Sequence, residues 1–207
     1  MKKKSEPGKR QLQTAANRKK IIETARELFK ENGFESTTMS DIIEATGLSN
    51  GTIYNLFPSK NDILYEIYMS YINIPLHLND DYETKVLHPI ESILDFSVKY
   101  INLWIDSGWS IAMNVYRAFS SKPEAAEYTD VNSLLRGQIV KTELREFIEH
   151  AQEAGTMIST ISAEEIENLL STHERGMLYL WGLLKGQYDF IGEAKKQFPV
   201  ILSPFIK

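Results

Sequence analysis

Residues 36–60 constrain this chain more than any other stretch, because their pattern specifies two short helices joined by one tight turn. Thr38, followed three residues later by Asp41, is a capping-box arrangement and predicts a helix over 39–46. Gly47 is expected to end this helix, since glycine tolerates the left-handed backbone that such a turn requires. The first half of the stretch therefore predicts a short helix that stops abruptly.

A second short helix is predicted directly after this turn. Ser49 is its expected N-cap, and the helix runs through Leu56 until Pro58 stops it. Two short helices around a glycine turn form the unit that DNA-binding proteins lay into a major groove. An ordinary corner between two helices is the alternative interpretation.

Residues at fixed offsets in this stretch resemble the DNA-binding domain of the tetracycline-repressor (TetR) family of bacterial regulators. The resemblance covers about 17–65, and its most specific part is the run GTIYNLFPSK at 51–60. Asn50 departs from the pattern, because the family commonly has lysine or arginine there. The residues that carry the resemblance are Thr38, Asp41, Ile42, Ala45, Gly47, Leu48, Ser49, Gly51, Thr52, Ile53, Tyr54, Phe57, Pro58, Ser59, Lys60, Ile63 and Leu64.

The resemblance implies an all-α protein with an N-terminal three-helix helix-turn-helix domain and a larger helical domain for ligand binding and dimerisation. We accordingly divide the chain into a basic flexible arm at 1–16, a DNA-binding domain at 17–65 and an effector-binding and dimerisation domain at 66–207. It also implies a homodimer on a pseudo-palindromic double-stranded DNA operator, acting as a repressor that a small molecule releases. A ligand-independent helical DNA-binding or adaptor protein, acting through protein contacts, is the alternative.

The expected DNA contacts divide into two groups. Thr38, Tyr54 and Lys60 are expected to contact phosphates and set the register. The exposed side of the second helix is expected to face base edges, where the missing side chain of a glycine allows close approach. For the tyrosine the alternative is a core position, and for the lysine a solvated charge. The full set is Thr38, Ser49, Asn50, Gly51, Thr52, Tyr54, Asn55 and Lys60.

Charge is distributed unevenly along the chain. The net charge is −5, but residues 1–65 hold 11 Lys and Arg against 8 Asp and Glu, a net of +3. Residues 66–207 hold 12 against 20, a net of −8. A basic N-terminal end on an acidic body directs attraction for a polyanion to the predicted helix-turn-helix.

Apolar periodicity predicts helices along the rest of the chain. Residues 1–14 lack it and are expected to be a disordered arm that either tracks phosphates or only aids solubility. Residues 88–108 are apolar nearly all round, which favours a buried central helix. The predicted helices cover 17–32, 59–74, 88–108, 110–120, 131–154, 163–185 and 190–206.

The body offers an expected effector site and an expected dimer interface. Aromatic residues favour a flat or apolar ligand, while Asp106 near two tryptophans would also permit a cation. The expected ligand-binding residues are Phe96, Tyr100, Trp104, Met113 and Tyr116. The last two helices are either core or half of an intermolecular four-helix bundle, and the resemblance implies the bundle. The expected interface residues are Ile166, Leu170, Met177, Trp181 and Phe198.

Several classes of function are disfavoured. The chain has no Cys, so it has no disulfide or thiolate chemistry, which suits a cytoplasmic protein. Its four histidines are dispersed, and no metal-ligand spacing or nucleophile motif is present, so we expect no metal, no cofactor and no enzymatic activity. The longest apolar run, 177–184, is too short to span a membrane. His173, Glu174 and Arg175 form the one polar cluster on the apolar stripe of 163–185, and we expect them to bond within a helix interface.

Overall fold

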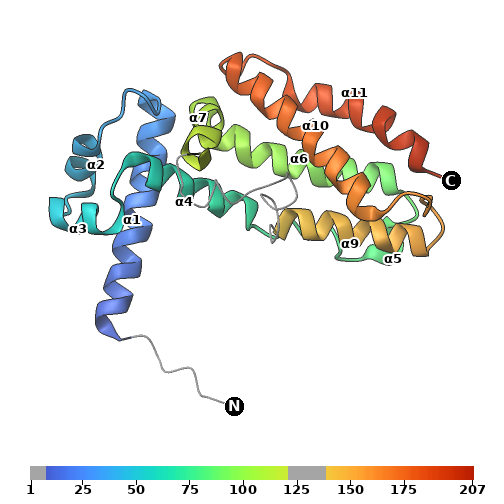
Figure 1. The fold of residues 1–207 in the computed structure, drawn as a ribbon, viewed down its shortest axis with the longest axis horizontal. Helices are drawn as coiled ribbons and strands as arrows, with labels where there is room; N and C mark the ends of the chain where they lie inside the picture. The colour runs from blue at the N-terminus through green and yellow to red at the C-terminus, as the bar shows by residue number, and fades with distance from the viewer. Residues whose placement is uncertain (1–7, 121–138) are drawn as a thin grey trace.

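The computed structural model describes residues 8–120 and 139–207, and these residues form an all-α fold (Figure 1). In these ranges extended structure is limited to one isolated bridge between Met157 and Ile206. The helices are α1 (Lys9–Asn32), α2 (Met39–Thr46), α3 (Asn50–Leu56), α4 (Lys60–Ile72), α5 (Tyr82–Lys85), α6 (Pro89–Ser107), α7 (Trp109–Ser120), α9 (Ile139–Glu153), α10 (Ala163–Leu183) and α11 (Phe190–Leu202), followed by the 3₁₀ turn η2 (Ser203–Phe205).

The two short helices predicted around the glycine turn are confirmed, together with their caps. The Thr38 hydroxyl accepts a hydrogen bond from the Asp41 backbone N–H, and the Asp41 carboxylate accepts one from the Thr38 backbone N–H at 2.7 Å. Gly47 ends α2 in the left-handed conformation with φ 64°. Ser49 caps α3 by accepting a hydrogen bond from the backbone N–H of Thr52. All these bonds join residues a few positions apart, which explains why the sequence predicts them.

Helix α1 begins eight residues earlier than the sequence pattern indicates. Gly8 is its N-cap, and the side chain of Gln11 accepts a hydrogen bond from the Gly8 backbone N–H at 3.0 Å. Residues 9–16 face solvent, so their helix needs no apolar stripe and rests on good helix formers such as Gln and Ala. The assignment of a flexible arm to 1–16 is therefore wrong for 9–16, and 1–7 lie outside the described residues.

The N-terminal helices pack around a small apolar core, with α1 lying against both α2 and α4. Phe29 and Phe34 meet edge to face there, with ring centroids 5.0 Å apart. Ile42 from α2 and Ile53 from α3 are fully buried, so both short helices are anchored through their inner sides.

The body is a helical bundle in which α10 packs against α7, α9 and α11, while α11 also covers α6 (Figure 1). Helix α6 is not apolar all round, contrary to the prediction. Its charged and amide side chains recur every three or four residues and form one exposed stripe, so the helix is amphipathic with its other side in the core. The stripe is Glu91, Asp95, Lys99, Asn102 and Asp106.

The remaining predicted helices are present with shifted ends. Helix α9 is described from Ile139, and the earlier part of the predicted 131–154 helix lies outside the described residues. Helix α11 continues past Pro199 to Leu202. The segment between α4 and α6 contains the single turn α5.

The N-terminal helices are fastened to the body by α7 as well as by α4. The buried backbone N–H of Phe34 donates a hydrogen bond to Ser110 Oγ at 2.7 Å, across 76 residues of sequence. Beside it, Gly108 lies against the side chain of Lys30, where a Cβ would be 3.5 Å from Lys30 Cγ. The turn between α6 and α7 therefore holds the end of α1 and the loop that leads into α2.

Replacing Ser110 by alanine should weaken this attachment. The substitution leaves the Phe34 N–H buried without a partner, and we expect a loss of about 1–3 kcal/mol in the free energy of unfolding. Urea denaturation measures it, with Ser159→Ala at an exposed position as the control. Equal stability of the two variants would show that the bond contributes nothing.

Candidate DNA-binding interface and effector cavity

Helix α3 exposes the polar side that the sequence analysis assigned to DNA. Ser49, Asn50, Gly51 and Asn55 are exposed and Thr52 is half-buried, while Ile53 on the opposite side is fully buried. The buried side packs into the core and so fixes the orientation of the whole helix. The outer side is free to approach another molecule.

Thr38 and Tyr54 also lie on the surface of this unit. Thr38 is exposed at the N-cap of α2. Tyr54 is 48% exposed, so the alternative that it is a core tyrosine does not hold. Both hydroxyl groups are accessible to a phosphate oxygen.

Lys60 has a different position from the one expected. Its Nζ donates hydrogen bonds to the backbone oxygens of Phe34 (2.8 Å), Thr37 (3.0 Å) and Glu35 (3.2 Å). It also lies 4.5 Å from the centroid of the Phe34 ring. An ammonium group has three N–H donors, and here all three are used inside the protein. Lys60 thus ties the start of α4 to the loop between α1 and α2.

Among residues 8–65 the basic side chains all lie on α1, except Lys60, and none lies on α2 or α3. Helices α2 and α3 contain no Lys or Arg and carry the acidic Asp41 and Glu44. The beginning of α1 projects well past them (Figure 1). The exposed basic side chains on this part of α1 are Lys9, Arg10, Lys19 and Lys20. Lys19 lies 3.7 Å from Glu23, and the half-buried Arg18 is paired with Glu66. The helix-forming residues around Lys9 and Arg10 were the feature of the sequence from which this basic helical surface could have been predicted.

A small cavity lies where α4, α6, α9, α10 and α11 meet, with a volume of about 30 Å³. Its lining residues are Tyr68, Tyr100, Trp104, Val140, Lys141, Ser171, Glu174, Arg175, Leu178 and Phe190. Tyr100 and Trp104 were expected to bind ligand and do line it. The volume is close to that of a single water molecule, so a larger ligand requires the walls to separate.

The other expected ligand residues lie elsewhere. Phe96 is buried in the core away from the lining. Met113 packs against Gly182, where an added Cβ would lie 2.9 Å from Met113 Cγ. The side chain of Tyr116 is outside the described residues. Asp106 is exposed and does not line the cavity, so the expected route to a cation site there is wrong.

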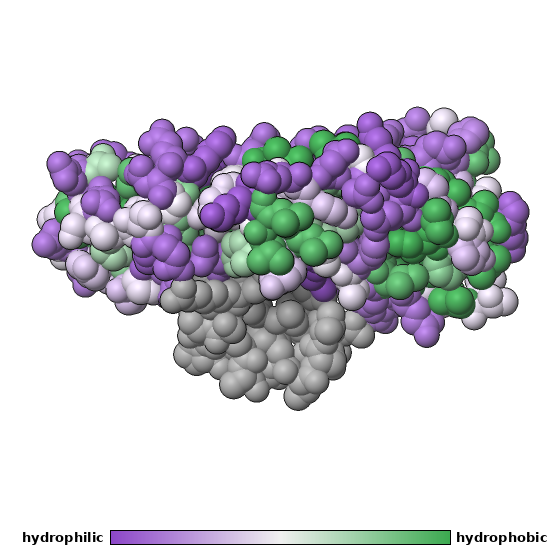
Figure 2. Space-filling view, turned by 90° about the horizontal axis from the view of Figure 1, so that it is seen from above, coloured by the Kyte–Doolittle hydropathy of each residue, from purple (hydrophilic) through white to green (hydrophobic). Residues whose placement is uncertain are grey.

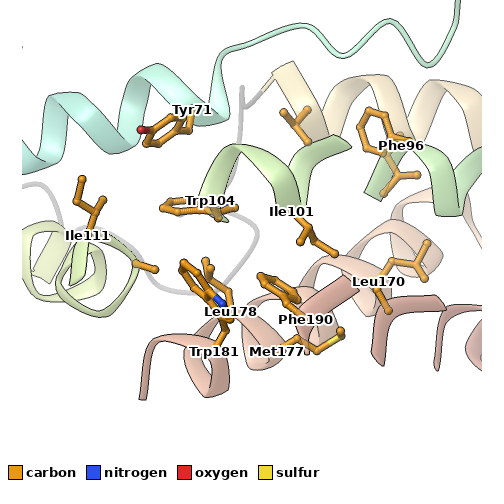
Figure 3. Packing of buried hydrophobic residues seen from close by; sticks show 14 of the residues in the cluster. Tyr71, Phe96, Ile101, Trp104, Ile111, Leu170, Met177, Leu178, Trp181 and Phe190 are labelled. Atoms are coloured by element: carbon orange, nitrogen blue, oxygen red, sulfur yellow. The ribbon is translucent and has the colours of Figure 1, made fainter. Parts of the chain in front are cut away.

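The aromatic side of the cavity connects it to α4. The Trp104 ring lies 5.3 Å from the ring of Tyr71 and 6.1 Å from that of Tyr68, centroid to centroid. Figure 3 shows Tyr71 and Trp104 facing each other between α4 and α6, with Phe190 and Trp181 among the side chains below. Since Tyr68 also lines the cavity, α4 forms part of the cavity wall.

A polar wall, which the sequence analysis did not assign to the effector site, closes the other side. Glu167 is fully buried and forms an ion pair with Lys141 at 2.7 Å. Ser171 donates to the same carboxylate at 2.7 Å, and Arg145 approaches its other oxygen at 3.7 Å. Burial lowers the pKa of Lys141, although the adjacent Glu167 opposes the shift. Desolvation of both charges offsets much of the stability that their attraction provides.

Several buried polar atoms in and beside this wall have no hydrogen-bond partner among the described residues, namely Glu174 Oε1, Trp104 Nε1, Glu167 Oε2 and Arg145 Nε. The expectation that Glu174 bonds within a helix interface is therefore wrong for its Oε1. Burial raises the pKa of Glu174 to about 8, against a smaller opposing effect of Arg175. Its carboxyl group is consequently mostly protonated at neutral pH. Ser171, Glu174 and Arg175 recur at helical spacing on α10, and that repeat was the signal available in the sequence.

The five residues expected at a dimer interface are buried inside one subunit. Their exposed fractions are between 0% and 6%, so they leave no surface for a second copy, and the expectation is corrected. Large apolar side chains do remain exposed on the opposite sides of α10 and α11, namely Leu169, Tyr179, Leu180, Leu183, Leu184 and Val200. Figure 2 shows apolar surface over the body and mostly polar surface over the N-terminal helices.

The stability of the protein should depend on pH through Glu174. Its folded-state pKa, about 8, lies above the ordinary value of 4.5. Between these values the folded state keeps a proton that the unfolded chain releases, so stability falls as pH rises through this window. Glu174→Gln should therefore be more stable than wild type at pH 8.5, on the order of a few kcal/mol, and the difference should shrink toward pH 4.5.

Urea unfolding at pH 5 and 8.5 measures this difference. Glu164→Gln, at an exposed position on the same helix, is the control. A gain of the same size at both pH values would contradict the buried, protonated carboxyl.

Comparison with known proteins places this geometry in a family context. Residues 21–67 match the family described as bacterial regulatory proteins, tetR family. The HTH-type transcriptional regulator YfiR of Bacillus subtilis is 43% identical over 47 residues, which are 23% of this chain and 23% of YfiR. An HTH-type transcriptional regulator of Staphylococcus aureus is 30% identical over 89 residues, which are 41% of this chain and 45% of that protein. The chain thus spans less than half the length of these curated relatives.

The fold is similar over a longer range. The crystal structure of Thermus thermophilus FadR, a TetR family transcriptional repressor in complex with lauroyl-CoA, has a TM-score of 0.63 and 20% identity, covering 89% of this chain and 93% of FadR. Among the described residues no cluster of side chains fits a metal ion. None of the helices described is long and apolar enough to cross a membrane.

Proposed function

We propose that this chain, whose N-terminal domain belongs to the TetR family of bacterial regulatory proteins, is a sequence-specific DNA-binding transcriptional regulator controlled by a small molecule. The observation that carries the proposal is helix α3, which exposes Asn50, Gly51 and Asn55 while Ile53 anchors it. A rigid helix with a polar outer side suits insertion into a major groove. The protein acts in the cytoplasm as a repressor that its ligand releases from an operator.

In this proposal residues 17–65 bind DNA, with α3 contacting the bases and α1 providing most of the positive charge. Asn50 and Asn55 contact base edges, since amide side chains can donate and accept together. Thr38 and Tyr54 donate to phosphates. Because α2 and α3 carry no basic residue, most of the electrostatic attraction comes from α1, through Lys9, Arg10, Lys19 and Lys20. Lys60 acts indirectly by holding the loop before α2.

Duplex binding should therefore depend on salt through α1 and on sequence through α3. With palindromic duplexes from the promoter region of the chain's own gene, affinity should fall by about 10³–10⁵-fold between 50 and 200 mM salt if roughly 6–10 phosphates are neutralised. The double variant Lys9→Gln, Arg10→Gln should weaken all duplexes alike and lower the salt slope. Asn55→Ala should also reduce the preference for the operator.

Fluorescence anisotropy at several salt concentrations measures both effects. The double variant Lys195→Gln, Lys196→Gln removes the same charge from exposed positions on α11 and is the control. A flat salt response of the wild type would contradict the proposal.

The protein is proposed to be a homodimer whose interface uses the exposed apolar residues of α10 and α11. Leu180, Leu183 and Leu184 are spaced by three and four residues and lie 42% to 52% exposed on one side of α10. Gly176, one turn earlier, is exposed with no atom within 4 Å of a built Cβ, which would allow a second helix to approach closely. Two such helix pairs can form a four-helix bundle, and a two-fold dimer matches a palindromic operator.

A charge on this surface should separate the subunits without unfolding them. Leu183→Glu introduces a carboxylate where two copies would meet, so we expect a monomer with a wild-type circular dichroism spectrum. Leu87→Glu, at a leucine 62% exposed before α6, should stay dimeric. Sedimentation velocity at equal concentrations distinguishes the two, and a dimeric Leu183→Glu variant would move the interface elsewhere.

Ligand control is proposed to act through the contact between the cavity and α4. Tyr68 lines the cavity and Tyr71 packs on Trp104, so a ligand that separates the walls displaces α4, and with it α3. A change in the separation of two reading helices breaks their match to the ~34–36 Å groove repeat. The small cavity volume favours the second candidate, a ligand-independent DNA-binding protein. Ligand affinity measured with and without operator separates them, since coupling must be reciprocal.

A further inference from the structure

The polar wall of the cavity is rich in hydrogen-bond donors. Trp104 Nε1 is a donor without a partner among the described residues. Lys141 uses two of its three N–H donors, on Glu167 and Asn168, and one remains. Arg175 lines the cavity, and the guanidinium group can only donate. Glu174, mostly protonated at neutral pH, carries an O–H that it can donate.

Acceptors are fewer than donors on the cavity lining. Glu167, which does not itself line the cavity, accepts from Ser171 and pairs with Lys141 through Oε1, while its Oε2 makes no hydrogen bond and lies 3.7 Å from Arg145. Because the Lys141–Glu167 pair is neutral as a whole, Arg175 leaves the lining positive while Glu174 holds its proton. Donors in excess, with positive charge, favour a ligand group that accepts hydrogen bonds and carries negative charge.

The aromatic part of the lining sets the shape of the rest of the ligand. It consists of Tyr68, Tyr100, Trp104 and Phe190, and the Trp104 ring meets that of Tyr100 edge to face at 6.2 Å. Flat rings in this arrangement favour an aromatic body that can slide between them. A ligand with an aromatic body and an anionic end would touch both walls at once.

We propose that the cavity takes an aromatic carboxylate as effector, with its carboxylate held by Arg175, Lys141 and Trp104 Nε1–H and its rings among Tyr68, Tyr100 and Phe190. The inference rests on the proposed function, since it names the chemical class that acts at that site. Binding opens the cavity, because its resting volume of about 30 Å³ is far smaller than such a molecule.

A cationic aromatic ligand, paired with an ionised Glu174, is the competing class. It would have to displace a proton from a buried carboxyl group and lie beside Arg175 and Lys141. Like charges at close range disfavour it. The two classes are separable because they depend on different residues of the same wall.

Three probes with one aromatic body test the charge requirement, namely naphthalene-2-carboxylate, naphthalene-2-carboxamide and naphthalen-2-ylmethylammonium. Calorimetry on the full chain at pH 7 should give the carboxylate an affinity at least about tenfold above the other two. Arg175→Gln should lower carboxylate affinity by about tenfold or more and leave the carboxamide unchanged. Lys99→Gln, which removes an exposed charge from α6, is the matched control.

A second variant keeps the test independent of folding. Trp104→Phe removes the Nε1–H together with part of the indole ring, so both neutral and anionic probes lose ring contact, but carboxylate affinity should fall about five- to tenfold more than carboxamide affinity. Tighter binding of the ammonium probe, with loss of that binding in Glu174→Gln, would overturn the anion assignment and leave ligand control intact. Binding of none of the probes at millimolar concentration would overturn it as well.

The proposed function fails in a different way. If the carboxylate binds as proposed but operator affinity is the same with and without it, the ligand class stands and ligand control of DNA binding does not. If operator affinity falls when the carboxylate binds, both stand.

Discussion

The orientation of α3, the helix proposed to read DNA, depends on the hydrogen bonds that hold the loop between α1 and α2. The Phe34 backbone supplies both ends of this attachment, since its N–H donates to Ser110 Oγ and its carbonyl accepts from Lys60 Nζ. One bond comes from α7 and the other from α4, so the loop is held between two helices of different origin. The bond to Ser110 is buried, so its loss would leave the Phe34 N–H unpaired, whereas the bond from Lys60 is partly buried. A displacement of α4 or α7 is thereby passed to α2 and α3.

One of these two helices, α4, also lines the cavity and so links the body to α2 and α3. Tyr71 and Tyr68 on α4 contact Trp104, which lines the cavity as well. Closely packed protein interiors move as rigid pieces, because they leave little free volume for local rearrangement. A small expansion at Trp104 is therefore expected to reappear as a tilt of α4. The proposed ligand control needs no contact between ligand and DNA.

The buried charges of the body reduce the stability of the helical bundle, but they supply polar groups for the proposed ligand site. Glu167 and Lys141 are desolvated together, and Glu174 holds a proton that it would lose in water at neutral pH. Apolar residues of similar volume would make a stabler bundle. The unpartnered polar atoms beside these charges fit a cavity that opens for a polar ligand group, and the proposed carboxylate would satisfy Trp104 Nε1.

The sequence by itself determined the two short helices, because their caps join residues three positions apart, as in the Thr38–Asp41 pair. Periodicity also indicated the long helices and so the all-α class. It could not decide which side of α10 faces inward, since that helix is apolar on two sides, and only packing in three dimensions buried Trp181 and left Leu183 exposed. The roles of Lys60 and Glu174 were likewise set by tertiary structure. Lys60 bonds to a loop far away in the sequence, and Glu174 is buried where no other described segment provides a partner for its Oε1.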